Sequence, residues 1–148
     1  MVWFRHGVIH YRAVRVFSDF IEPNKLGWLA INNTFVKTLA DPPTVHGADL
    51  WFVKHTRLPA GQAPDDLSLP PDLVVVVRSP SEHRGKIFTI IGEYLRAGAA
   101  VVVILDPDTA TASVYRPDVF QQIFDNGDEL VIPDVLPGFA VPVRKFFE

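Results

Sequence analysis

The chain has 148 residues, of which 48% are hydrophobic and 21% are charged, so it is long enough to bury the core of one globular domain. It contains no cysteine, which excludes disulfide bonds, thiolate nucleophiles and cysteine-ligated zinc. Its 14 lysines and arginines against 17 aspartates and glutamates give a net charge of −3, without the basic surplus of a dedicated DNA-binding protein. The longest apolar run, 97–105, is half of the roughly 18 residues that a membrane helix needs, so we expect a soluble, cytoplasmic protein with no membrane partner.

The first third of the chain predicts a helix followed by antiparallel strands. Apolar residues recur every three or four positions from His6 to Phe20, which is the spacing of an amphipathic helix. Two β-rich segments, Leu26–Ile31 and Thr34–Leu39, are separated by an Asn-Asn pair and predict a hairpin. A further strand is expected over Asp49–Lys54, after two prolines that break the chain.

The middle of the chain predicts the centre of a sheet. Five consecutive β-forming residues, Leu73–Val77, suit a strand that is covered on both faces. A helix is expected over Arg84–Ala97, with Gly98 as its stop, followed by a second apolar strand at Val101–Leu105. Strand, helix and strand in this order predict a parallel pair joined by a right-handed crossover.

The last third predicts short antiparallel strands at Thr111–Arg116 and Val119–Phe124, which we expect at the periphery, and a tail that ends in a short packed helix. The fold class predicted from all these elements is α/β of the mixed, α+β kind: a mixed β-sheet flanked by helices. We expect one domain that spans residues 1–148.

Acidic residues at the starts of two strands mark a candidate metal site. Asp49 opens one strand, and side-chain alternation places Asp72, Val76 and Arg78 on one face of the next. A magnesium-dependent hydrolase needs hard oxygen ligands that converge on one point, and it commonly has a cation near the phosphate. Asp49 supplies one carboxylate, position 76 suits a second, and Arg78 or the following helix could supply the cation. The alternative for both aspartates is an ordinary role in a turn.

The five histidines form no recognisable set of metal ligands. His6 and His10 lie four residues apart and so share one face of the predicted helix. The glutamate of a His-Glu-x-x-His zinc site is missing between them.

The motifs, in their order along the chain, resemble those of the Uma-two family, restriction-endonuclease-like members of the PD-(D/E)xK nuclease superfamily. The similarity runs from His6 to Phe147. It is carried by Asp49–Val53, Pro71–Val75, Ser79-Pro80-Ser81, Tyr94-Leu95, Ala97-Gly98, Asp106-Pro107, Val114–Pro117 and Asp134–Phe139. The resemblance implies a restriction-endonuclease-like fold and hydrolysis of DNA phosphodiester bonds with magnesium, with Asp49 as a metal ligand.

This chain departs from the family pattern at two positions of the implied site. Members usually carry glutamate at the position of Val76 and lysine at the position of Ile90, and both residues are apolar here. Asp72 lies four residues before Val76, which is about 13 Å along a strand, too far to share one metal ion with position 76.

Three charged residues are candidates to replace the missing groups. Arg78 occupies the lysine position of a literal (D/E)xK motif. Lys86 lies one helical turn before Ile90 and is long enough to reach back, and Glu93 lies three residues after it. The alternative for each is a solvated charge on an exposed face.

Three functions remain open from the sequence. The first is a magnesium-dependent DNA endonuclease with impaired catalysis, and the second is an inactive pseudonuclease that serves as a binding or oligomerisation scaffold. The third is an unrelated small-molecule site on the same fold. The family usually begins with a hairpin that this chain lacks, so we expect an exposed sheet edge and a homodimer.

Overall fold

The computed structural model describes residues 4–37, 45–65, 69–80 and 84–148. None of the helices in these ranges is both long and apolar enough to span a membrane. In chain order the elements are α1 (Phe4–Ile21), β1 (Gly27–Lys37), β2 (Val45–Lys54), β3 (Leu73–Val77), α2 (Arg84–Arg96), β4 (Val101–Asp106), β5 (Thr111–Tyr115), β6 (Gln122–Phe124), β7 (Glu129–Ile132), β8 (Leu136–Pro142) and the 3₁₀ helix η1 (Val143–Phe146).

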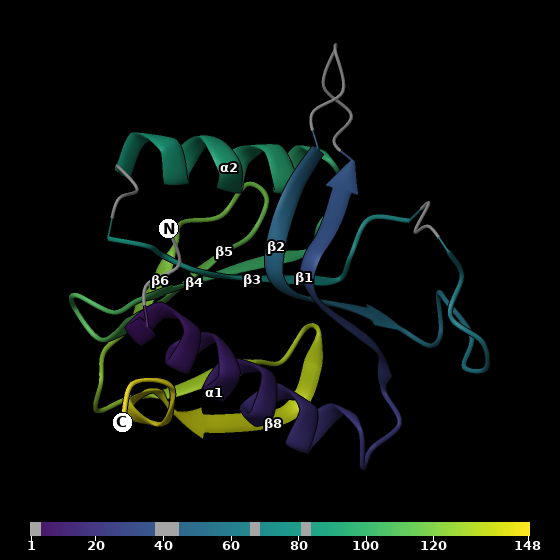
Figure 1. Cartoon of the computed structure of the whole chain (residues 1–148), viewed down its shortest axis with the longest axis horizontal. Coiled ribbons are helices and arrows are strands. Elements are labelled where there is room, and N and C mark those ends of the chain that lie inside the picture. Colours follow the sequence, from purple (N-terminus) through teal and green to yellow (C-terminus); the bar gives the residue numbers. More distant parts are fainter. Residues whose placement is uncertain (1–3, 38–44, 66–68, 81–83) are drawn as a thin grey trace.

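A six-stranded mixed sheet with the order β1-β2-β3-β4-β5-β6 is the frame of the molecule. The central strands β3 and β4 are parallel and α2 connects them, as the sequence predicted, while every other pair of neighbours is antiparallel. Strands β7 and β8 form a separate hairpin. Figure 1 shows α2 on one face of the sheet and α1 with β8 on the other, which confirms the predicted mixed sheet with helices on its faces.

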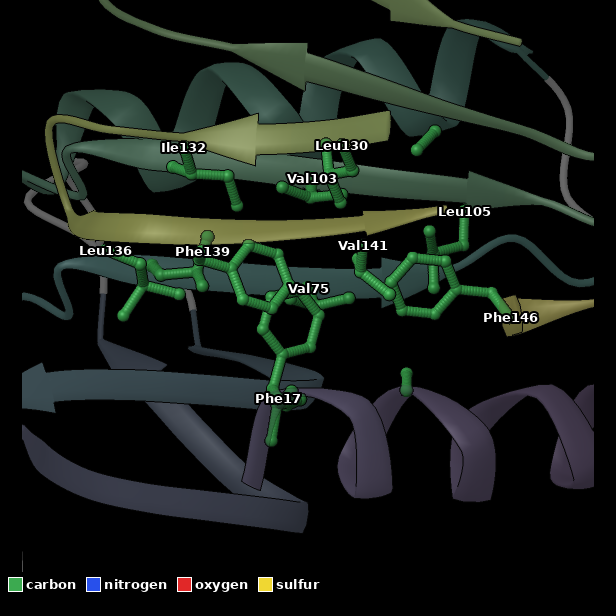
Figure 2. Packing of buried hydrophobic residues seen from close by; sticks show 14 of the residues in the cluster. Phe17, Val75, Val103, Leu105, Leu130, Ile132, Leu136, Phe139, Val141 and Phe146 are labelled. Carbon is green, nitrogen blue, oxygen red and sulfur yellow. The ribbon is translucent and has the colours of Figure 1, made fainter. Parts of the chain in front are cut away.

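Two hydrophobic cores lie on the two faces of the sheet. Along β3, Val75 and its alternate neighbours face α1, whereas Val74 and Val76 face α2. On the α1 side Phe17 stacks on Phe139 of β8, with 5.1 Å between the ring centroids (Figure 2). Because both faces of β3 are buried, its sequence can be an unbroken run of apolar residues.

The start of the sheet differs from the predicted hairpin. Instead of turning at the Asn-Asn pair, the chain continues through it as one strand, β1, which pairs with β2 along its length. The register shifts between Ile31 and Thr34, where two residues of β1 lie opposite one residue of β2, so the one extra residue is absorbed in a β-bulge. The end of the second predicted strand, at Leu39, lies outside the described residues.

The C-terminal third is also more central than predicted. Leu130, Ile132 and Leu136 of the β7–β8 hairpin are fully buried, and they pack with Phe146 of η1 in the α1-side core (Figure 2). The predicted short terminal helix is present as η1. This hairpin, over which the sequence predicted no strands, therefore covers the core.

A buried carboxylate joins the end of β2 to the start of β3. Asp72, 7% exposed, accepts a hydrogen bond from the backbone N–H of Lys54 at 2.8 Å through Oδ2. Its other oxygen, Oδ1, lies 3.1 Å from Nη1 of Arg57. We call Asp72 with these two partners the Asp72 latch. Its contacts are those of a structural residue.

We predict that Asp72→Ala lowers the free energy of unfolding by about 2–4 kcal/mol, because the part-buried N–H of Lys54 loses its acceptor and Arg57, which keeps its hydrogen bond to the Pro70 carbonyl, loses its carboxylate partner. Urea denaturation with circular dichroism measures the loss. Asp65→Ala, which removes an exposed loop carboxylate, is the matched control and should be near neutral. Equal effects of the two substitutions would contradict the latch.

Two glycines are predicted to respond to alanine with opposite signs. A Cβ at Gly27 would lie 2.2 Å from the carbonyl oxygen of Val53, so Gly27→Ala forces the backbones apart and should cost about 1–3 kcal/mol. Gly7 is exposed in α1 with no atom within 4 Å of such a Cβ, so Gly7→Ala should stabilise by about 0.5–1 kcal/mol. Thermal unfolding of both variants tests the pair, and a shift of the same sign in both would be the wrong result.

Candidate functional site

The register of the sheet brings Asp49 and Val76 together. Leu50 pairs with Val75 and Trp51 with Val74, so continuing the antiparallel register by one residue places Asp49 beside Val76 on the neighbouring strand. The alternation of side chains directs position 76 toward α2. The sequence correctly predicted this neighbourhood of the two positions.

The Asp49 carboxylate closes the hydrogen-bonded ladder between β2 and β3. Its Oδ2 accepts the backbone N–H of Val77 at 2.7 Å, and the side chain is 21% exposed. A strand's N–H usually pairs with a backbone carbonyl, and here a side chain takes that place. One oxygen of the carboxylate is therefore committed to the fold.

Two histidines of α1 hold the same end of the sheet, and we call them the histidine clamp. His6 Nε2 lies 2.9 Å from the carbonyl oxygen of Val77 and 4.0 Å from Oδ1 of Asp49. His10 Nε2 lies 2.6 Å from the carbonyl oxygen of Asp49. Their four-residue spacing is thus used for backbone contacts to two adjacent strands. The sequence showed that they share a helix face but held no signal of what that face meets.

An apolar wall stands where the family resemblance implies a glutamate and a lysine. Val76 is only 8% exposed and belongs to the α2-side core with Ile87, Ile91 and Ile104. Ile90 is half-buried and packs against the same cluster. Neither position offers an oxygen ligand or a cation.

Tyr94 lies under this wall and was not predicted as a site residue. It is fully buried, and burial together with the negative charges of Asp49 and Glu93 raises the pKa of its phenol. The hydroxyl therefore keeps its proton at neutral pH. From the sequence, Tyr94 stood out only in the Tyr94-Leu95 motif of the family resemblance, because its proximity to Asp49 depends on how α2 docks on the sheet.

Arg78 forms ion pairs with two aspartates at and just after the end of β4. Its Nη1 donates to Oδ1 of Asp106 at 3.2 Å and to Oδ2 of Asp108 at 3.0 Å. The hydrogen bond to Asp108, with the further attraction of Asp106, raises the pKa of Arg78 despite the opposing effect of burial. Its charge is balanced by these two carboxylates.

The remaining predicted site residues are distributed over three places. Glu93 is half-buried on α2, where its charge acts on Tyr94, and one of its carboxylate oxygens is buried. Lys86 is exposed in the first turn of α2. Asp72 belongs to the latch, five residues before the Val77 amide that Asp49 binds. Of the predicted site residues, Asp49 and Glu93 both act electrostatically on Tyr94, whereas Lys86 and Asp72 lie elsewhere.

The residues at this end of the sheet do not fit a magnesium ion. Magnesium takes hard oxygen ligands in an octahedral arrangement. Asp49 has one oxygen committed to Val77, and position 76 contributes only methyl groups. Within the described ranges no cluster of three or more histidine, aspartate or glutamate side chains could hold a metal ion.

Comparisons with known proteins agree on the fold. The crystal structure of a protein from Anabaena variabilis, described as a "putative nuclease belonging to DUF820", matches with a TM-score of 0.84. The two sequences are 20% identical, and the match covers 99% of this chain and 82% of that one. No curated protein matches this sequence.

The sequence also matches a family model over residues 2–144, and the model's description is "Putative restriction endonuclease". That match includes Asp49, Val76 and Ile90, and it confirms the resemblance inferred from the motifs. This chain therefore belongs to the Uma2 family.

Proposed function

We propose that this chain is a restriction-endonuclease-like protein that has lost most or all of the metal-dependent hydrolysis of DNA and persists as a binding scaffold. The observation that carries this proposal is Val76, a buried apolar residue beside Asp49 in the α2-side core. A carboxylate at that position would be the second metal ligand. Valine leaves Asp49 as the one acid of the pair.

The expected loss of rate is large on general grounds. Removing one strong electrostatic contribution of about 3–4 kcal/mol slows a reaction by roughly 10²–10³-fold. Here a ligand at position 76 and a cation at position 90 are both replaced, and such losses combine without being additive. Arg78, which could have replaced the cation, has its charge balanced by Asp106 and Asp108.

The second candidate function is an active endonuclease with a rearranged magnesium site. One observation favours it: the negative charges of both Asp49 and Glu93 raise the pKa of Tyr94, so both carboxylates lie within electrostatic range of the same phenol. Glu93 would then be the migrated ligand and DNA the substrate. A DNA partner and a homodimer both remain predictions under either function.

A cleavage assay on supercoiled plasmid separates the two functions. We predict that the wild type leaves the plasmid intact with magnesium or manganese. Val76→Glu combined with Ile90→Lys should restore nicking, because it returns a ligand and a cation to an otherwise preserved scaffold. Adding Asp49→Asn to this double variant keeps an acceptor for the Val77 amide but weakens the metal ligand, so nicking should be lost.

The contrary result is nicking by the wild type that disappears in Asp49→Asn and in Glu93→Gln. That pair of losses would establish the rearranged site. Circular dichroism of each variant ensures that a loss of nicking is not a loss of fold.

A further inference from the structure

A groove of about 420 Å³ lies on the α2 side of strands β4, β5 and β6. Its floor includes one row of the sheet, in which Ile104 pairs with Ser113 and Ser113 with Ile123. Ile87 and Phe88 of α2 line it as well. We call this cavity the β6 groove. The same row continues through Val76, which pairs with Ile104, so the groove adjoins the apolar wall beside Asp49.

The charge of the β6 groove favours a cation. Its lining contains one arginine, Arg78, and two carboxylates, Asp106 and Asp125. Arg78 is already neutralised by Asp106 and Asp108. In the part of the chain that the structure describes, no hydrogen bond or ion pair engages the Asp125 carboxylate, whose backbone N–H instead binds Asp128. A phosphate would meet a surplus of negative charge here, whereas a lysine or arginine would find an acceptor.

The rim of the groove is aromatic and apolar. Phe88 is 53% exposed and lies edge-to-face with Tyr115, with 6.3 Å between the ring centroids. Ile123, which also lines the groove, is 56% exposed, and Val119 and Phe120 on the loop that leads into β6 are 59% and 98% exposed. Aromatic faces attract cations, and the aliphatic stems of lysine and arginine pack on such surfaces.

An open sheet edge lies next to these side chains. Strand β6 is the last strand of the six-stranded sheet (Figure 1), and its outer side has no neighbouring strand among the described residues. Such an edge presents backbone donors and acceptors to any extended chain that can pair with it.

From these features we infer that the β6 groove and the β6 edge together bind an extended, basic segment of a partner protein. The segment adds to the sheet as a strand beside β6. One of its lysine or arginine side chains enters the groove, pairs with Asp125 and packs against Phe88. This inference goes beyond the proposed function, because it assigns the scaffold a class of partner, and it does not depend on whether Asp49 supports catalysis.

A second copy of this chain is the less favourable occupant of the same edge. Two-fold pairing of β6 with β6 around Ile123 would place Asp125 opposite Gln121 of the other copy, which supplies no cation for the carboxylate. The strand is also short, Gln122–Phe124, whereas a stable dimer buries about 800 Å² on each partner. A basic segment supplies a cation for Asp125, and because one of its side chains also enters the β6 groove, it does not depend on the buried area that a dimer needs.

Selection of short random peptides displayed on phage against the full chain tests this inference. We expect the enriched peptides to combine β-forming residues with lysine or arginine, and a synthetic copy to bind in a fluorescence anisotropy titration. Asp125→Lys should weaken binding at least about tenfold, and Phe88→Ser should weaken it as well. Asp65→Lys, the same change on an exposed loop outside the groove, should have no effect.

A backbone-methylated copy of the peptide tests the strand pairing. It keeps every side chain but loses the amide donors on one side, so its binding should fall. Because Asp125 and Phe88 are exposed, their replacement leaves the fold intact, which circular dichroism checks.

Three results would overturn the inference: no enrichment, enrichment of acidic peptides, or binding that is indifferent to Asp125→Lys. A concentration-dependent dimer in sedimentation that Ile123→Lys dissociates would assign the edge to a second copy instead. None of these outcomes bears on plasmid nicking, so the inference and the proposed function can fail separately.

Discussion

The hydrogen bond from the Val77 amide to the Asp49 carboxylate is the contact on which this end of the molecule depends. It ends the ladder between β2 and β3 at 2.7 Å, next to the point where His6 and His10 of α1 contact the same two strands. A single carboxylate thus joins both strands at the place where α1 also meets them. The Asp49 carboxylate therefore has a structural role that does not depend on metal binding.

Local patterns were enough to predict the centre of the sheet. The apolar runs at β3 and β4 and the glycine stop after α2 determine a parallel pair with a crossover helix, and Gly98 has a φ of +107°, a conformation that favours glycine. The β1 hairpin was predicted wrongly because a bulge is selected by the long partner strand β2, not by the Asn-Asn pair itself. Similarly, the buried role of the β7–β8 hairpin depends on α1, which lies more than a hundred residues earlier.

The residues of the candidate site likewise fall into those that local patterns predicted and those whose position depends on packing between distant elements. Asp49 and Val76 were predicted as neighbours because strand register follows from alternation and order. Tyr94, the histidine clamp and the ion pairs of Arg78 were not, since each depends on how two distant elements dock. Under the proposed function the fold is kept while position 76 lacks a metal ligand, and a fold by itself does not assign an activity. The β6 groove beside this site is where we infer that the same face of the sheet binds a partner.

Calorimetric titration with manganese tests the central claim most directly, because it measures metal binding without requiring DNA. We predict no binding heat for the wild type and one bound ion for Val76→Glu, since glutamate would add the missing ligand beside Asp49. Burial should raise the pKa of the glutamate introduced at position 76 when no metal is bound. Because the metal binds the deprotonated carboxylate, metal binding should strengthen as the pH rises. Stoichiometric binding by the wild type that is lost in Asp49→Asn would contradict the account.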